Sequence, residues 1–273
     1  MSVLAEAGVA SPRVDAELLA AEVLGVPRSR LPTVAGFDPA AAERFNALIM
    51  ERAARRPVQH LIGTAAFWKG ELAVGPGVFI PRFDTELLVE WGVARLGASS
   101  APVVVDLCSG TGAIALAVAA ERPLATVYAV ENSPEALEWL RRNVSGTRVT
   151  IVAGDATDPA TLSTVDGRVD LVLCNPPYVP DGTQVQREVA EHDPYQAVFG
   201  GVDGLDVIRP VIARAAGLLR PGGWLGIEHD DSHGEAVPEL LAGAGAYTDI
   251  AEHRDLAGRP RFATARRLAD CIP

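Results

Sequence analysis

The strongest constraint on the fold is an alternation that begins at Asp84 and continues through most of the remaining chain. Short runs rich in valine and leucine, typical of strands buried on both faces, alternate with stretches that have apolar spacing at i, i+3 and i+4, typical of helices. This order predicts a doubly wound, mostly parallel α/β sheet with helices on both faces. The expected strands are 103–107, 126–131, 148–154, 169–175 and 223–229, and the expected helices lie near 113–121, 133–144, 206–219 and 234–243.

The first part of the chain has a different pattern and is expected to form a small helical domain. Residues 12–25 and 39–56 are rich in alanine, have helical apolar spacing and carry a proline near their start. Short β-like runs broken by glycine and proline follow, which predicts a hairpin. The expected organisation is a helical partner-recognition domain over 1–62, a β-hairpin connector over 63–83 and the α/β domain over 84–273.

The net charge of −11 restricts the class of partner. Residues 1–62 contain seven arginines and seven acidic residues, so the whole negative excess falls on residues 63–273. Non-specific affinity for nucleic acid depends on lysine and arginine displacing counterions from phosphates. We therefore expect a protein or small-molecule substrate and no direct contact with nucleic acid. The sequence gives no basis for an oligomeric state.

The cellular compartment is inferred from the first residues, from the apolar runs and from the cysteines. The first residues include acids and lack the pattern of a signal peptide, and no run approaches the roughly 20 apolar residues of a membrane span. Cys108, Cys174 and Cys271 lie far apart without C-x-x-C spacing, which is typical of a reducing compartment. We expect a cytoplasmic protein without membrane contact.

A glycine-rich loop after the first expected strand indicates a nucleoside-bearing cofactor. Asp106 ends that strand, and Gly110 and Gly112 allow a tight turn and a close approach of backbone to ligand. Ligands of doubly wound sheets bind at this edge, outside the carboxyl ends of the strands. Glu131 ends the next strand, where a carboxylate is positioned to accept hydrogen bonds from two ribose hydroxyls.

The loop alone leaves the cofactor open. Gly110 to Ala115 also fits the G-x-G-x-x-A fingerprint of dinucleotide sites, so an NAD-dependent dehydrogenase and a noncatalytic nucleotide-binding module are alternatives. The carboxylate of Asp106 favours a cationic cofactor tail, such as that of S-adenosylmethionine, and would repel a pyrophosphate.

The stretch CNPPY at 174–178 indicates the chemistry. Proline cannot donate to a sheet ladder, and two prolines leave the corner little conformational freedom. The side-chain carbonyl of Asn175 and the main-chain carbonyl of Pro176 are acceptors that suit the two hydrogens of a planar NH2 group, and Tyr178 is expected to stack on its flat face. Fixing both hydrogens directs the nitrogen toward an electrophilic methyl group. Asn175→Asp, which keeps an acceptor oxygen, is expected to retain more activity than Asn175→Ala.

The combination D-x-x-x-G-x-G with N-P-P-Y resembles class I S-adenosylmethionine-dependent methyltransferases that act on planar NH2 groups. The stretches 79–90, 188–206 and 219–237 are similar to the bacterial release-factor glutamine methyltransferases, the HemK or PrmC family. The resemblance implies a Rossmann-like fold and methylation of the side-chain amide nitrogen (N5) of the glutamine in the Gly-Gly-Gln loop of class 1 peptide-chain release factors. A ribosomal-protein glutamine methyltransferase and a nucleic-acid adenine-N6 methyltransferase are alternatives.

The resemblance also implies site residues. Residues 108–112 and Glu131 would hold the methionine and ribose parts of the cofactor, and Asp155 and Ala156 would lie by the adenine. The full cofactor set is Asp106, Cys108, Ser109, Gly110, Thr111, Gly112, Glu131, Asp155, Ala156 and Asn175; the glutamine would bind Asn175, Pro176, Pro177 and Tyr178, of which Asn175, Pro176 and Tyr178 are the catalytic candidates.

Some residues depart from the family pattern. Cys108 replaces the usual first glycine of the loop, so the turn there is expected to be one that a side chain tolerates. Glu131 replaces the commoner aspartate and Phe83 a usual proline. Asp230 and Asp231 occupy a turn where glycine and an aromatic residue are more usual.

Two further groups of residues, a histidine pair and an arginine cluster, have the spacing of possible sites. His229 and His233 flank an acidic pair, but structural metal sites use four ligands and catalytic sites three, so no metal is expected. Arg52, Arg55 and Arg56 end a predicted helix, where they are expected to favour the helix C-terminus and water, with contact to an acidic partner left open.

Overall fold

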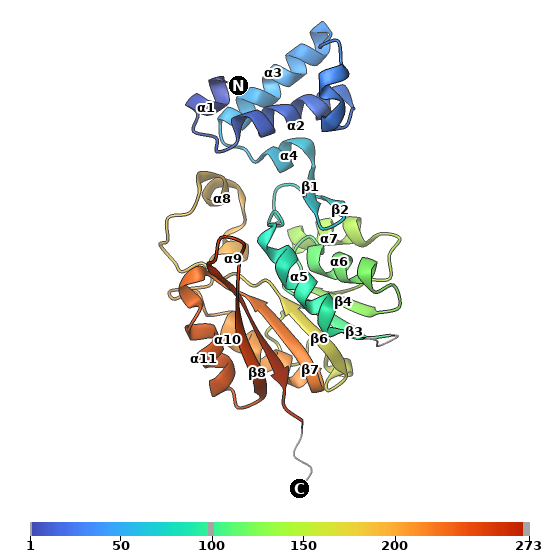
Figure 1. Ribbon diagram of the computed structural model, residues 1–273, viewed down its shortest axis with the longest axis vertical. Helices are drawn as coiled ribbons and strands as arrows, with labels where there is room; N and C mark the ends of the chain where they lie inside the picture. The colour runs from blue at the N-terminus through green and yellow to red at the C-terminus, as the bar shows by residue number, and fades with distance from the viewer. Residues whose placement is uncertain (1, 98–100, 270–273) are drawn as a thin grey trace.

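The computed structural model describes residues 2–97 and 101–269, so Cys271 lies outside the described residues. Four helices and a 3-10 turn form the N-terminal part, drawn at the top of Figure 1. Proline at the first helical position begins the two longer helices, as predicted, and Gly25 in the left-handed conformation ends the first of them. The bounds are α1 Ser2–Glu6, α2 Pro12–Leu24, the turn Arg28–Thr33, α3 Pro39–Ala53 and α4 Val58–Ile62.

A two-stranded hairpin follows. Strands β1 (Thr64–Phe67) and β2 (Gly70–Ala73) pair antiparallel, and Trp68 in the connecting turn has a φ of 57°. The indole nitrogen of Trp68 donates to Glu121 over 2.8 Å, which fastens the hairpin to the α/β part of the molecule. The predicted hairpin is therefore present within residues 64–73.

The rest of the chain forms a seven-stranded sheet with the order β5-β4-β3-β6-β7-β9-β8. Strands β3 to β7 are parallel, and β9 runs antiparallel to both of its neighbours. The predicted doubly wound, mostly parallel fold is confirmed. The strands are β3 Val103–Leu107, β4 Thr126–Glu131, β5 Thr150–Ala153, β6 Val169–Cys174, β7 Leu219–Glu228, β8 Tyr247–Arg254 and β9 Pro260–Arg267; the helices are α5 Asp84–Arg95, α6 Ala113–Glu121, α7 Pro134–Val144, α8 Arg187–His192, α9 Tyr195–Val198, α10 Ile208–Leu218 and α11 Ala236–Gly243.

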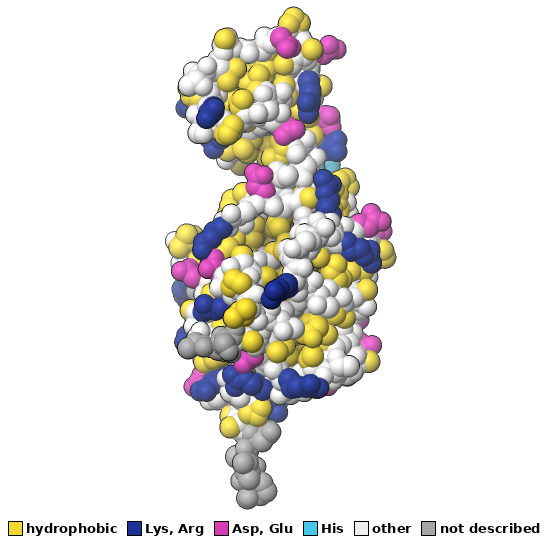
Figure 2. Space-filling view, turned by 90° about the vertical axis from the view of Figure 1, so that its right-hand side faces the viewer, with side chains coloured by type: hydrophobic (Ala, Val, Ile, Leu, Met, Phe, Trp, Pro, Cys, Tyr) yellow, Lys and Arg dark blue, Asp and Glu magenta, His cyan; other side chains and the backbone are white. Residues whose placement is uncertain are grey.

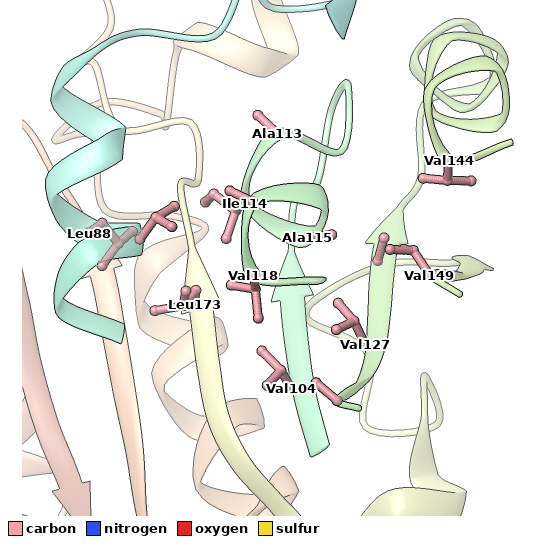
Figure 3. Close-up of a cluster of buried hydrophobic side chains, with 14 of the residues drawn as sticks. Leu88, Val104, Ala113, Ile114, Ala115, Val118, Val127, Val144, Val149 and Leu173 are labelled. Carbon is pink, nitrogen blue, oxygen red and sulfur yellow. The ribbon is translucent and has the colours of Figure 1, made fainter. Parts of the chain in front are cut away.

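Two hydrophobic cores cover the two faces of this sheet. One joins the sheet to α5, α6 and α7, and the other joins it to α10 and α11. Figure 3 shows side chains of the first core, where Leu88 of α5 points toward Leu173 of β6. Both leucines are fully buried, and each such burial contributes about 2–3 kcal/mol.

The strand order places a crevice beside β3. From β3 the sheet continues through β4 and β5 on one side and through β6 and β7 on the other. The chain therefore changes direction at the β3–β6 pair, where Leu107 lies opposite Cys174. Doubly wound sheets bind ligands at such a switch point.

The expectation that the arginines at the end of α3 and just after it mainly face water is wrong for Arg52 and Arg55. Arg52 is buried, and its guanidinium contacts Asp15 of α2 over 2.7 Å and Glu188 of α8 over 2.8 Å. Arg55 also bonds to Glu188, whereas Arg56 pairs at the surface with Glu51. Arg52 and Arg55 thus join the helical part to the sheet-containing part across the narrower waist seen in Figure 2.

Within the described ranges, every helix is too short or too polar to cross a bilayer.

Candidate active site

A cavity of about 750 Å³ opens at the carboxyl ends of β3, β4 and β6. This volume lies within the usual range of small-molecule sites. The segments that surround it are far apart in the sequence and meet at the switch point of the sheet. Its walls include Val78, Phe79, Thr85, residues 108–111, Glu131, Asp155, Ala156, Asn175, Pro177, Tyr195, Phe199 and Asp206.

The glycine loop joins β3 to α6 and forms the floor of the cavity. Gly110 has a φ of 54° and Gly112 a φ of 84°, both in the left-handed region. The Gly112 N–H donates to the Ser109 carbonyl over 2.7 Å, which closes a tight turn. Cys108, the departure from the family pattern, has a φ of 60°. A non-glycine residue can adopt this conformation at a cost of about 1–2 kcal/mol, so the turn accommodates the Cys108 side chain with some strain.

Glu131 at the end of β4 lies against this loop and lines the cavity. Its Oε2 accepts from the Gly110 N–H over 2.8 Å, and its Oε1 accepts from the N–H groups of Asn132 and Ser133. A carboxylate has about four acceptor positions, so one direction on Oε2 remains for a ligand hydroxyl. Glu131 therefore fits a ribose hydroxyl and also holds the loop in place.

Asp106 lies beneath the loop and does not line the cavity. Its side chain is fully buried; Oδ2 accepts from the Ala115 N–H over 3.1 Å, and Oδ1 has no hydrogen-bond partner among the described residues. Burial raises the pKa of this carboxyl to about 7. The sequence suggested that Asp106 contacts the cofactor directly. Because Asp106 is not part of the cavity wall, its influence on a ligand is electrostatic.

The charges around the cavity distinguish between the two kinds of cofactor. Glu131, Asp155 and Asp206 line it, and no lysine, arginine or histidine of the described residues does. Such a wall repels the pyrophosphate of a dinucleotide and suits a cofactor that carries a sulfonium and an ammonium group. The residues present therefore fit S-adenosylmethionine.

The predicted adenine side of the site follows β5. Asp155 lines the cavity, and its Oδ1 accepts from the backbone N–H and the hydroxyl of Thr157 in a tight turn. Ala156 is buried and also contributes to the wall. Both residues thus line the cavity, and their contact with the adenine stays a prediction.

The Asn-Pro-Pro-Tyr corner follows β6. Asn175 and Pro177 line the cavity; Pro176 is buried and is not among the lining residues, so the contact of its carbonyl with a substrate stays a prediction. The Asn175 Oδ1 and the Pro176 carbonyl accept no hydrogen bond from the described residues. Tyr178 is not part of the wall, because its hydroxyl turns inward and donates to Glu228 over 2.9 Å. The predicted stacking of Tyr178 on a ligand is therefore not supported.

Several residues of the wall were not identified from the sequence. Phe79, Tyr195 and Phe199 supply aromatic surface, and the rings of Tyr195 and Phe199 stack with centroids 4.6 Å apart. Thr85 lies beside Asn175 and receives its Nδ2–H over 3.2 Å. Thr85 and Phe79 lie in the FIPRFDTE stretch that carried part of the family resemblance, and this was their only signal.

The other candidate residues have structural partners. The Nε2 of buried His229 lies 2.8 Å from Glu252, and that of His233 lies 2.9 Å from the Asp203 carbonyl. Asp230 caps a 3-10 turn by accepting from the Ser232 N–H over 3.0 Å. No cluster of potential metal ligands occurs in the part of the chain that the structure describes.

The chain matches known proteins along most of its length. Residues 1–63 match the PrmC N-terminal domain, and residues 71–193 match the methyltransferase small domain. The release factor glutamine methyltransferase of Mycolicibacterium smegmatis is 55% identical over 97% of this chain and 94% of its own. That of Mycobacterium tuberculosis H37Rv is 45% identical over 97% of this chain and 88% of its own.

A solved structure agrees with the fold. A methyltransferase from Pyrococcus furiosus superimposes with a TM-score of 0.51 at 18% identity, covering 82% of this chain and 98% of its own. At this identity the likeness concerns the fold alone. The identities to the curated relatives carry the assignment: the chain is an S-adenosylmethionine-dependent methyltransferase and belongs to the release factor glutamine methyltransferase family.

Proposed function

We propose that the protein transfers a methyl group from S-adenosylmethionine to the side-chain amide nitrogen of the glutamine in the Gly-Gly-Gln loop of class 1 release factors, in the cytoplasm. The observation that carries the proposal is the position of Asn175, whose side chain lines the cavity beside the glycine loop. The family to which the chain belongs indicates the substrate.

The corner at Asn175 suits an amide nitrogen as nucleophile. Such a nitrogen is weak because its lone pair is delocalised into the carbonyl group. Bound S-adenosylmethionine would supply an electrophilic methyl group. In the proposal, Asn175 Oδ1 and the Pro176 carbonyl accept the two amide hydrogens, which orients the nitrogen and favours the positive charge that develops on it.

We also propose a division of labour along the chain. The helical domain, residues 1–62, would select the protein partner, the hairpin connector would span 63–83, and residues 84–273 would bind the cofactor and carry out methyl transfer. The balanced charge of residues 1–62 and the negative excess of the remainder support a protein partner and argue against an adenine in nucleic acid.

Mass spectrometry of a class 1 release factor, after incubation with S-adenosylmethionine and the protein, tests the proposal. We expect one added methyl group on the Gly-Gly-Gln peptide and none when that glutamine is alanine. Asn175→Ala should lower the rate by roughly 10²–10³-fold, the usual effect of removing a positioned polar group, with a much smaller effect on cofactor affinity. A methyl group found on a ribosomal protein or on adenine instead would refute the release-factor assignment.

A further inference from the structure

The amide of Asn175 is useful only in one orientation. Asparagine carries an acceptor oxygen and a donor nitrogen on the same planar group, and a rotation of the side-chain amide exchanges them. With Oδ1 toward the cavity, Asn175 accepts a hydrogen from a substrate NH2 group. With Nδ2 toward the cavity, two donors would face each other and the substrate would be repelled.

The hydroxyl of Thr85 faces the nitrogen of that amide. Asn175 Nδ2 donates to Thr85 Oγ1 over 3.2 Å, and Thr85 Oγ1 in turn donates to Glu228 Oε2 over 2.8 Å. Because a hydroxyl has one hydrogen, and Thr85 gives it to the carboxylate, its oxygen can only accept from Asn175. The direction of both hydrogen bonds is therefore set by Glu228.

Glu228 is placed to act as a fixed acceptor. Its side chain is 1% exposed at the end of β7, and its second oxygen accepts from the Tyr178 hydroxyl. The pKa of this carboxyl is raised above its ordinary value, mainly by burial; the hydrogen bonds from Thr85 and Tyr178 and the charge of Arg261 act in the opposite direction, because they stabilise the ionised form that accepts them. Burial also raises the pKa of Tyr178, so that its hydroxyl keeps its hydrogen.

We infer that Thr85 and Glu228 are positioning residues that lock the Asn175 amide with its oxygen toward the substrate nitrogen. The inference rests on the proposed function and adds to it a role for two residues outside the Asn-Pro-Pro-Tyr corner. Thr85 comes from the start of α5 and Glu228 from the end of β7, so the orientation of the residue that follows β6 is controlled from two neighbouring elements.

Two substitutions of Thr85 separate this role from packing. Thr85→Val keeps the shape of the side chain and removes the hydroxyl, whereas Thr85→Ser keeps the hydroxyl and removes a methyl group. We expect Thr85→Val to lower kcat for release-factor methylation by about 10- to 100-fold, as a misplaced reacting group does. Thr85→Ser should restore kcat to within about threefold of wild type. The dissociation constant of S-adenosylmethionine and the melting temperature are measured for both variants.

The outcomes are distinct. A wild-type protein that leaves the release factor unmethylated would refute the proposed function, and with it the role of Thr85. If the wild type is active, two results would refute the inference but not the proposed function. One is a Thr85→Val variant with the kcat of wild type, and the other is an equal kcat in Thr85→Ser and Thr85→Val. A loss of kcat matched by an equal loss of cofactor affinity would also refute it, because amide orientation should affect the substrate and not the cofactor.

Asn175→Asp gives a second test that does not depend on the folding of the Thr85 variants. Aspartate would place a second carboxylate oxygen against Thr85 Oγ1, whose single hydrogen already serves Glu228. The structure therefore changes the expectation drawn from the sequence: Asn175→Asp should be no more active than Asn175→Ala. An Asn175→Asp variant whose kcat clearly exceeds that of Asn175→Ala would overturn the inference.

Discussion

Asp106 shows how one buried residue can make ligand binding depend on pH. Its carboxyl group is fully buried, and one of its oxygens has no partner in the part of the chain that the structure describes. Burial raises its pKa to about 7, and the nearby charge of Glu131 acts in the same direction. The neutral form is thus favoured in the free protein below pH 7. The contribution of Asp106 to the free energy of unfolding is fully present below about pH 4, the pKa of the group in the unfolded chain, and is lost as the pH rises through 7. A cation bound nearby favours the ionised form and offsets that loss.

We therefore expect the affinity for S-adenosylmethionine to rise between pH 6 and 8 because binding of the cation is coupled to release of the Asp106 proton. Each unit by which binding lowers this pKa adds about tenfold to the affinity at high pH. Asp106→Asn keeps an acceptor for the Ala115 N–H and cannot ionise, so its affinity should vary less with pH. Calorimetric titration of both proteins measures this, and titration of the cofactor's own amine is common to both. Identical pH profiles would show that Asp106 is not coupled to the cofactor.

At the scale of elements, the loop between β3 and α6 contains two glycines with different roles. Both have positive φ, but a Cβ on Gly112 would lie 2.6 Å from Leu140 Cδ1 of α7, whereas a Cβ on Gly110 would meet nothing closer than Val78 Cγ2 at 4.0 Å. Gly112 thus allows α6 to begin against α7, and Gly110 serves the turn alone.

Gly112→Ala should therefore destabilise the protein more than Gly110→Ala. Backbone strain costs each variant about 1–2 kcal/mol, and overpacking adds about 1–3 kcal/mol at position 112 only. The free energy of unfolding in urea measures both. Equal losses of stability would mean that α7 moves away from the added methyl group at little cost.

Local pattern predicted most of the elements and part of the site. Strand 103–107 is apolar apart from Asp106, and the structure gives β3 and β4 the predicted bounds, whereas the bounds of β5, β6 and β7 differ from the predicted ones. Strands β8 and β9 were not predicted, since β8 is an edge strand with many charged residues and β9 begins at Pro260. The Thr85–Glu228 hydrogen bond joins residues 143 positions apart, and only the folded sheet brings them together. The glycine loop and Glu131 were predictable because their spacing is local.

At the scale of the whole molecule, α8 connects the helical part to the cavity. Glu188 of α8 binds Arg52 of α3 and Arg55 of the turn that follows α3, and the chain that follows α8 supplies Pro194 and Tyr195 to the cavity wall. Burial alone would raise the pKa of Glu188, but hydrogen bonds from Arg55 and Arg52 lower it below the ordinary value for glutamate. Glu188 is thus charged at neutral pH, and the ion pairs fix the helical domain with respect to the wall that a substrate loop would enter.

Glu188→Gln should therefore impair methylation of a whole release factor more than methylation of a short Gly-Gly-Gln peptide. The change weakens charge-assisted hydrogen bonds of about 1.5–3 kcal/mol, so kcat/KM for the protein substrate should fall by about tenfold or more. A matched control is Glu191→Gln in the same helix, whose partner Arg187 is exposed and whose loss should cost about 0.3–0.5 kcal/mol. The peptide reaction reports on the cavity alone, since a short peptide has no surface for a helical domain to hold. An equal loss of kcat/KM for the protein and the peptide substrate would place the effect of Glu188 in the cavity wall. If Glu188→Gln and Glu191→Gln have the same kcat/KM for the protein substrate, the waist does not need the ion pairs of Glu188.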